Sequence, residues 1–103
     1  MIIHKLIAHH LKHKDDLSFY LIQAEDAIRW IEASGFRIGP GVTALDLGCG
    51  HGIFGAELAK LGCSVTYSDE TNLLDPSLAG SDFKPLDLEK QKIGDLGRFD
   101  LMI

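Results

Sequence analysis

The segment from Asp46 to Gly52 contains the residues of this chain that are best suited to chemistry. It reads Asp-Leu-Gly-Cys-Gly-His-Gly, so one carboxylate is followed by glycine at every second position, at Gly48, Gly50 and Gly52. Glycine adopts backbone angles closed to other residues, and without a Cβ its main chain can approach a ligand closely. Free N–H groups at a helix start add partial positive charge. These features favour a binding turn with Asp46 at its rim over a turn that needs glycine for steric reasons alone.

The elements on either side of this turn are a strand and a helix. Residues 42–47 are a short apolar run with a β-branched start, which predicts a buried strand. Residues 53–61 place apolar side chains at helical spacing, and residues 63–68 alternate apolar and polar side chains as a strand does. A strand, turn, helix and strand in close succession imply parallel pairing with a right-handed crossover. In such sheets, ligands bind at the carboxyl ends of the strands.

The remaining sequence predicts one helix before this unit and two strands after it. Residues 16–34 form an amphipathic helix that Asp15 or Asp16 can cap and that Gly35 ends. The other expected segments are a helical turn or frayed arm at 2–14, a loop at 36–41, a short strand at 83–86, an ambiguous stretch at 88–96 and a fourth strand at 98–103. The order of elements predicts an α/β fold with a doubly wound, mostly parallel sheet.

Composition and charge exclude several classes of protein. The chain has 103 residues, 46% of them hydrophobic and 24% charged, which is ordinary for one small globular domain. It contains no apolar run of about 18 residues and no signal-peptide core, so we expect no membrane association. Cys49 and Cys63 stand in unrelated contexts, which predicts no disulfide framework and a cytoplasmic protein. Residues 1–14 carry a charge of +3 and the remainder carries −8, so we expect no nucleic-acid partner.

The glycine segment resembles the first motif of the class I S-adenosylmethionine-dependent methyltransferases, an acidic residue followed by Gly-x-Gly-x-Gly. The resemblance covers about residues 36–103 and includes the Pro-Gly loop before the first strand. It also includes GCSVTYSDE, in which Asp69 stands 23 residues after Asp46, then PLDLE, and then the Phe99-Asp100 pair that opens the fourth strand. It implies a Rossmann-like fold that is truncated after the start of the fourth strand.

The same resemblance implies S-adenosylmethionine as the cofactor and assigns residues to its amino-acid end. Gly48, Gly50 and Gly52 would pass under the methionine part, and Asp46 would bind its ammonium group through water. Cys49 lies in this turn, and we interpret it as a small buried residue because nothing nearby would lower the pKa of its thiol.

At the nucleoside end, the resemblance assigns the residues that end the second and third strands. Asp69 would accept hydrogen bonds from both ribose hydroxyls, a task that suits a carboxylate because it only accepts and takes two donors at once. Glu70 is the rival for this role. Asp87 would accept from the adenine amino group, and Leu88 would pack near the ring.

The resemblance further implies methyl transfer to an acceptor that the sequence leaves unidentified, and we expect a small molecule. Because the sulfonium is already an activated donor, the main demand is to hold donor and acceptor in line. A base is needed only if the acceptor must lose a proton, and no catalytic residue is identified. We expect residues 1–35 to be a helical segment and residues 36–103 to be the cofactor-binding half of an incomplete domain. By itself such a fragment should lack the acceptor site and be inactive.

A dinucleotide-binding domain of an NAD(P)-dependent oxidoreductase is the main alternative. Residues 50–55 match Gly-x-Gly-x-x-Gly, and an acid follows about 20 residues later. The register argues against it, because taking Gly50 as the strand-closing glycine places Gly48 and an unpaired Asp46 inside a buried strand. We interpret Gly55 as a site of close helix–sheet packing.

A non-catalytic fragment is the second alternative, and the histidines bear on it. His9 and His13 are one helical turn apart, and with His4 and His10 they offer metal-ligand spacing. No acid or cysteine joins them, so we expect a solvated basic arm and no metal site. His51 lies beside the cofactor by position only, and no catalytic role is assigned to it.

Overall fold

The computed structural model describes residues 17–87 and 89–103, which divide into two compact units between Arg37 and Ile38. The predictions for the histidine-rich arm, for the caps Asp15 and Asp16 and for Leu88 lie outside the described residues. Within the described ranges, no helix is long and apolar enough to cross a membrane.

The first unit contains one long helix, α2 (Leu17–Ala33). Its buried residues, Phe19, Ala24 and Ile28, recur at helical spacing, as the apolar pattern predicted. The helix ends where Gly35 adopts a φ of 98°, a left-handed conformation that suits glycine. The predicted helix at 16–34 is therefore confirmed over the described residues.

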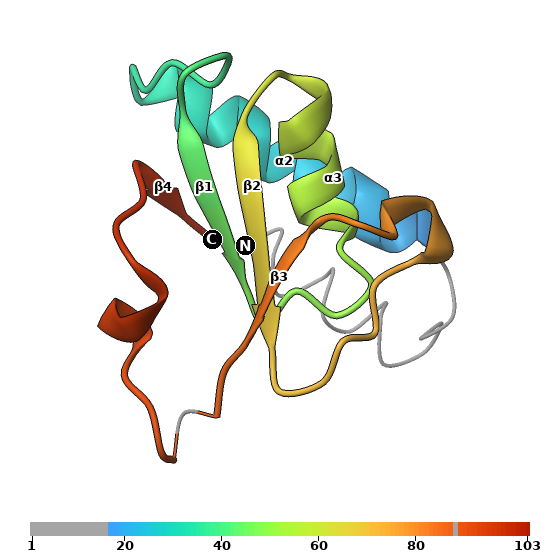
Figure 1. Cartoon of the computed structure of the whole chain (residues 1–103). Coiled ribbons are helices and arrows are strands. Elements are labelled where there is room, and N and C mark those ends of the chain that lie inside the picture. Colours follow the sequence, from blue (N-terminus) through green and yellow to red (C-terminus); the bar gives the residue numbers. More distant parts are fainter. Residues whose placement is uncertain (1–16, 88) are drawn as a thin grey trace. The chain divides into compact units, whose positions relative to one another are not determined.

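The second unit is a parallel sheet whose strands follow the order β3-β2-β1-β4 (Figure 1). All three neighbouring pairs are parallel, which confirms the α/β prediction. The strands are β1 (Thr43–Leu47), β2 (Ser64–Asp69), β3 (Asp82–Pro85) and β4 (Leu101–Met102). The helix α3 (Ile53–Lys60) joins β1 to β2, and two short 3-10 helices, η1 (Pro76–Leu78) and η2 (Ile93–Leu96), flank β3 in the sequence.

The central strand β1 is covered on both faces, as expected for a parallel sheet. On one face α3 packs against β1 and β2, with Leu58 fully buried. On the other face Leu45 forms a core cluster with Leu86 and Leu96, and Phe99 packs against it. Successive side chains of a strand point to opposite faces, so Asp46, next to Leu45, lies on the α3 face.

The last two predicted segments differ from the structure in extent. The ambiguous stretch at 88–96 holds η2, and the fourth strand is shorter than the predicted 98–103. The reason is the length of its partner, because β1 begins only at Thr43, to which the Asp100 N–H already donates at 2.9 Å. Residues before Asp100 therefore have no neighbouring strand to pair with.

Candidate functional site

The turn after β1 has the backbone conformation that its glycines predicted. Gly48, Gly50 and Gly52 all have left-handed φ values, of 67°, 53° and 84°, and α3 starts at the next residue. A Cβ at Gly52 would lie 2.7 Å from side-chain atoms of Leu74 and Leu78. At Gly48 and Gly50 a Cβ would meet no atom within 4 Å, so the space beside these two residues is open. The turn therefore combines a tight backbone with room for a ligand.

Asp46 lies inside β1 and is buried, with 6% of its surface exposed, rather than at the rim where it was predicted. Its Oδ2 accepts a hydrogen bond of 3.0 Å from the N–H of Gly55, the third residue of α3. The capping residue Gly52 has no side chain to offer, so Asp46 supplies the acceptor that an N-cap side chain normally provides. Burial, and less strongly the charge of Asp69, raises the pKa of Asp46 to about 6, although the Gly55 bond lowers it.

Asp69 ends β2 and is joined to the glycine turn through the backbone. Its Oδ2 accepts from the Gly50 N–H at 3.0 Å, and its Oδ1 accepts from the Glu70 N–H at 2.8 Å. A second backbone bond, from the Cys49 N–H to the Ser68 carbonyl at 2.9 Å, ties the same turn to β2. A carboxylate offers about four acceptor positions, so each oxygen of Asp69 retains capacity for one more donor.

Two further side chains at this site have pKa values that are raised by burial and, second, by nearby negative charge. Burial first, and then the carboxylates of Asp46 and Asp69, raises the pKa of the Cys49 thiol to about 11. Burial, with Asp46 next in effect, raises the pKa of Tyr67 to about 12. The Cys49 thiol therefore stays protonated at neutral pH, and a protonated thiol is a poor nucleophile.

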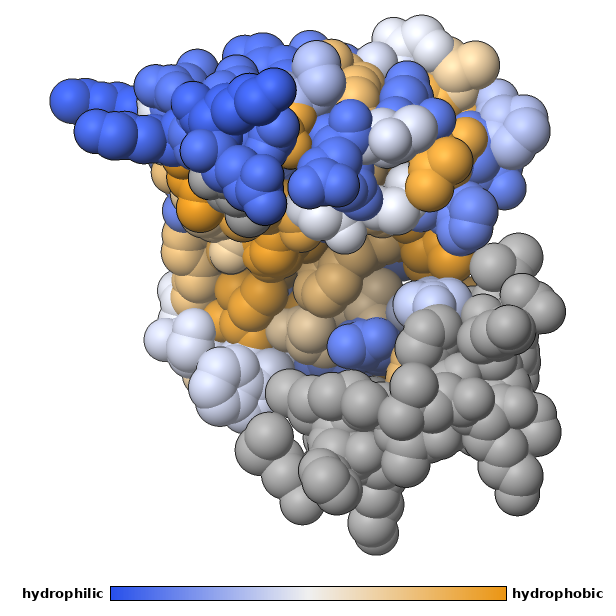
Figure 2. All heavy atoms as spheres, turned by 90° about the horizontal axis from the view of Figure 1, so that it is seen from below, coloured by the Kyte–Doolittle hydropathy of each residue, from blue (hydrophilic) through white to orange (hydrophobic). Residues whose placement is uncertain are grey.

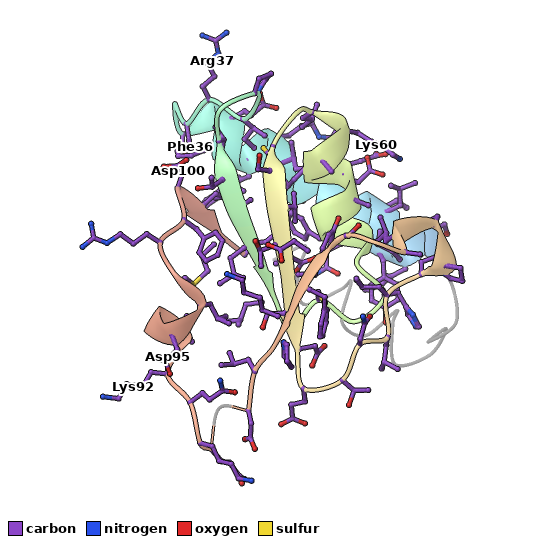
Figure 3. All side chains as sticks on the ribbon, in the orientation of Figure 1. Phe36, Arg37, Lys60, Lys92, Asp95 and Asp100 are labelled. Carbon is purple, nitrogen blue, oxygen red and sulfur yellow. The ribbon has the colours of Figure 1, made fainter. Side chains whose placement is uncertain are left out.

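No basic side chain of residues 38–103, as far as the structure describes them, forms an ion pair with Asp46 or Asp69. Lys60 pairs with Glu57 at 2.8 Å near the end of α3, and Lys84 donates to the Leu96 carbonyl at 3.2 Å. Figure 3 shows Lys60 at that end of α3, and Lys92 pointing away from the sheet. In the view from below, hydrophilic residues gather along one edge, and hydrophobic residues lie beside them (Figure 2). Among the described residues of 38–103, the two carboxylates thus border the glycine turn without a paired positive charge.

Asp87 follows β3, so the strand order brings it to the same edge of the sheet as Asp46 and Asp69. Its Oδ1 accepts from the Glu89 N–H at 2.9 Å, and its own N–H donates to Gln91 Oε1 at 3.0 Å. Asp87 is thus held in a local turn. Its other oxygen, Oδ2, accepts no hydrogen bond from the described residues.

The sequence analysis missed two contacts at this site, one made by Gly55 and one made by His51. A Cβ at Gly55 would lie 2.4 Å from Tyr67 Cε1, which confirms close helix–sheet packing, but the bond from Gly55 to Asp46 was not foreseen. That bond also corrects one argument against a dinucleotide site, because Asp46 is inside the strand and yet is not unpaired. His51 Nδ1 lies 2.9 Å from the Leu73 carbonyl, beyond the end of β2. The bond from Gly55 could have been found from the sequence, because a glycine near the start of a helix follows an acidic residue in the preceding strand. No sequence signal pointed to the contact between His51 and Leu73.

The burial of Asp46 generates a prediction on the pH dependence of stability. Its pKa is near 6 in the folded chain and 3.8 as the ordinary value, so the folded state binds more protons between these values. Stability from this group is therefore greatest below about pH 4 and falls as the pH rises through 6, by about 3 kcal/mol in total. Asp46→Asn, which can still accept from Gly55, should remove this decline. Urea unfolding of both proteins from pH 4 to 7 measures the difference.

The control for this experiment is Asp75→Asn. Asp75 is exposed, and the Ser77 N–H, which donates to it, holds the pKa of Asp75 below its usual value. Its contribution changes only at more acidic pH, so the decline between pH 5 and 7 should persist in this variant. An unchanged decline in Asp46→Asn would show that this carboxyl does not titrate there.

Comparisons with known proteins agree with this geometry. No family model matches the chain. Over 56 residues, or 53% of the chain, it is 41% identical to the ribosomal protein L11 methyltransferases of several Campylobacter jejuni strains, including RM1221. The matched segment spans only 20% of the length of these relatives. The fold is similar to that of magnesium protoporphyrin IX methyltransferase from Synechocystis PCC 6803, solved with bound SAH, with a TM-score of 0.58 and 24% identity over 81% of this chain and 40% of that one. In sequence and in fold, the chain thus resembles class I methyltransferases, as its glycine motif predicted.

Proposed function

We propose that this chain binds S-adenosylmethionine at the glycine turn and contributes the cofactor site of a methyltransferase. The observation that carries the proposal is the buried carboxylate of Asp46, which borders the turn with no cation paired to it among the described residues. The cofactor brings an ammonium and a sulfonium group. A positive charge near Asp46 stabilises its ionised form and offsets the cost of its burial. The site is therefore complementary to a cationic ligand.

The same carboxylates disfavour the pyrophosphate of a dinucleotide. Pyrophosphate binds at such turns by accepting hydrogen bonds from backbone N–H groups at the start of the helix. Here the Gly50 N–H already donates to Asp69, and the Gly55 N–H already donates to Asp46. An anion placed in this turn would compete for these donors and face two like charges at close range. Two of the N–H groups that an external anion would need are thus already bonded to the chain's own carboxylates.

The proposed roles at the nucleoside end depend on which carboxylate oxygens can still accept a hydrogen bond. Asp69 is oriented by two backbone donors and can take one further donor on each oxygen, which suits the two hydroxyls of a ribose. Asp87, at the same edge of the sheet, is assigned the adenine amino group. Glu70 contributes its backbone N–H to Asp69, whereas its side chain is exposed. This arrangement favours Asp69 over Glu70 as the ribose ligand.

The chain's own residues bind and orient in this proposal, and they do not act as acid or base. When bound, the cofactor would supply an activated methyl group on its sulfonium, which passes to the acceptor as the thioether S-adenosylhomocysteine leaves. The protonated Cys49 thiol cannot compete as a nucleophile, because its pKa is about 11. Asp46 holds the amino-acid end and Asp69 the nucleoside end, so the sulfur between them is fixed in position. Holding reactants in line is the largest contribution such a site can make to the rate.

The acceptor that we predict from the sequence is a small molecule. The names of the similar proteins offer two alternatives of different chemistry, a ribosomal protein and a magnesium porphyrin. Methyl transfer from radiolabelled cofactor to each of these, and to a small-molecule extract, distinguishes the three classes.

The identity of the cofactor can be tested by titration calorimetry. The protein should bind S-adenosylmethionine and S-adenosylhomocysteine, and it should bind NAD at least about a hundredfold more weakly, since the anion meets two carboxylates. Both arms use the same protein and the same buffer at pH 7. Preferential binding of NAD would contradict the methyltransferase proposal and support the oxidoreductase alternative.

The role of Asp69 generates a second prediction at the same site. Asp69→Ala removes two charge-assisted hydrogen bonds to the ribose, each worth roughly 1.5–3 kcal/mol, so affinity for S-adenosylhomocysteine should fall at least about tenfold. Asp69→Asn should keep part of this affinity. Glu70→Ala is the matched control, because it removes the adjacent carboxylate and leaves the backbone donor. If Glu70→Ala weakened binding and Asp69→Ala did not, the assignment of the ribose ligand would be wrong.

A further inference from the structure

His51 forms contacts that the proposed chemistry does not use. It stands between Gly50 and Gly52 in the glycine turn, and its side chain is exposed. Its Nδ1 lies 2.9 Å from the Leu73 carbonyl, and because a carbonyl only accepts, Nδ1 must carry the hydrogen. The His51 carbonyl in turn accepts from the Asp75 N–H at 3.0 Å. One residue thus holds the chain after β2 by both its side chain and its main chain.

The segment that His51 holds is residues 70–78, which we call the post-β2 segment. Its apolar residues also lie against the turn, since a Cβ at Gly52 would be 2.7 Å from the side chains of Leu74 and Leu78. Its first residue follows Asp69 directly, and the Gly50 N–H fixes that carboxylate at 3.0 Å. Three consecutive turn residues therefore contact this region: Gly50 binds Asp69, at the end of β2, and the next two residues contact the post-β2 segment.

These contacts restrict the position of Asp69, the proposed ligand of the ribose. Asp69 is fixed by Gly50, and four residues later the chain is fixed again by His51 at Leu73. Residues 70–72 therefore form a short bridge between two anchors. Releasing the second anchor lengthens the free segment next to Asp69 and increases its conformational freedom, which a bound ribose must then restrict.

We propose that His51 is a positioning residue for the nucleoside end of the site, acting through its Nδ1–H bond to Leu73. The proposal rests on the proposed function, because it assigns the nucleoside to Asp69. His51 touches no reacting atom in this account. It orders the post-β2 segment before the ligand arrives, so that less ordering remains when the ligand binds.

The test compares three substitutions of His51 in the full chain. Asn carries its amide nitrogen at the same number of bonds from the main chain as Nδ1, so His51→Asn can still donate to Leu73. His51→Gln places its nitrogen one bond farther out, and His51→Ala has no donor. Leu73→Ala is the matched control, because it removes an exposed side chain and keeps the carbonyl.

Two measurements are made on each variant: backbone hydrogen exchange of the ligand-free protein, and affinity for S-adenosylhomocysteine and adenosine. In His51→Ala and His51→Gln, exchange in the post-β2 segment should accelerate, and both affinities should fall by the same factor, about threefold to tenfold. His51→Asn and Leu73→Ala should behave as the wild type. An equal loss of affinity for adenosine, which lacks the amino-acid end, places the effect at the nucleoside end of the site. Thermal unfolding of each variant shows whether the substitution also lowers the stability of the fold.

Either of two results overturns the proposal: unchanged exchange and affinity in His51→Ala, or restoration by Gln and not by Asn. Faster exchange with unchanged affinity also overturns it, because His51 would then order the segment without affecting the ligand. If the wild type binds neither ligand, the proposed function is wrong and the positioning role fails with it. In that case the exchange rates still report separately whether His51 holds the segment.

Discussion

The second unit of this chain depends on one interaction, the hydrogen bond from the Gly55 N–H to the buried carboxylate of Asp46. It joins β1 to the first turn of α3 and caps a helix whose own N-cap residue has no side chain. The bond also determines residue types around it. Position 55 must be glycine, since a Cβ there would lie 2.4 Å from the Tyr67 ring, and the turn before α3 must be tight enough to bring the helix over the strand. A neutral side chain such as Asn at position 46 could also accept from the Gly55 N–H, without the cost of burying a charge. The negative charge of Asp46 therefore calls for a functional explanation.

We propose that this function is recognition of positive charge. The order of the strands brings the second carboxylate close to the first. Because β1 and β2 are parallel neighbours, Asp46 and Asp69 come to the same edge, where each accepts from a backbone N–H of the turn or of α3. Two N–H groups that could otherwise donate to an anion, those of Gly50 and Gly55, are thus occupied by the chain's own carboxylates. A turn that looks suited to phosphate by its glycines alone becomes, through these two acids, suited to a cation.

The local pattern of apolar residues and glycines in the sequence predicts most of the helices, strands and turns. The features that it does not predict depend on contacts between residues far apart in the sequence. Alternating glycines between an apolar strand and a helix predicted the turn at 48–52, because few residues other than glycine adopt left-handed backbone angles. The burial of Asp46 could not be predicted from its own neighbours, since it depends on Gly55 and Tyr67, which come from other elements. The contact of His51 depends likewise on the path of the chain after β2. The start of β4 is set by the start of its partner strand β1, and the sequence of residues 98–103 contains no information on that partner.

The central claim is that the buried carboxylate of Asp46 recognises positive charge, so that a bound cation lowers its pKa. Its most direct test is an NMR titration of the Asp46 carboxyl carbon in the free protein and in the protein saturated with S-adenosylmethionine. The account predicts a pKa of about 6 in the free protein and a fall toward the ordinary 3.8 when the ligand is bound. An Asp46 pKa that is the same with and without the ligand would contradict the account, because the carboxylate would then not sense the charge that it is proposed to recognise.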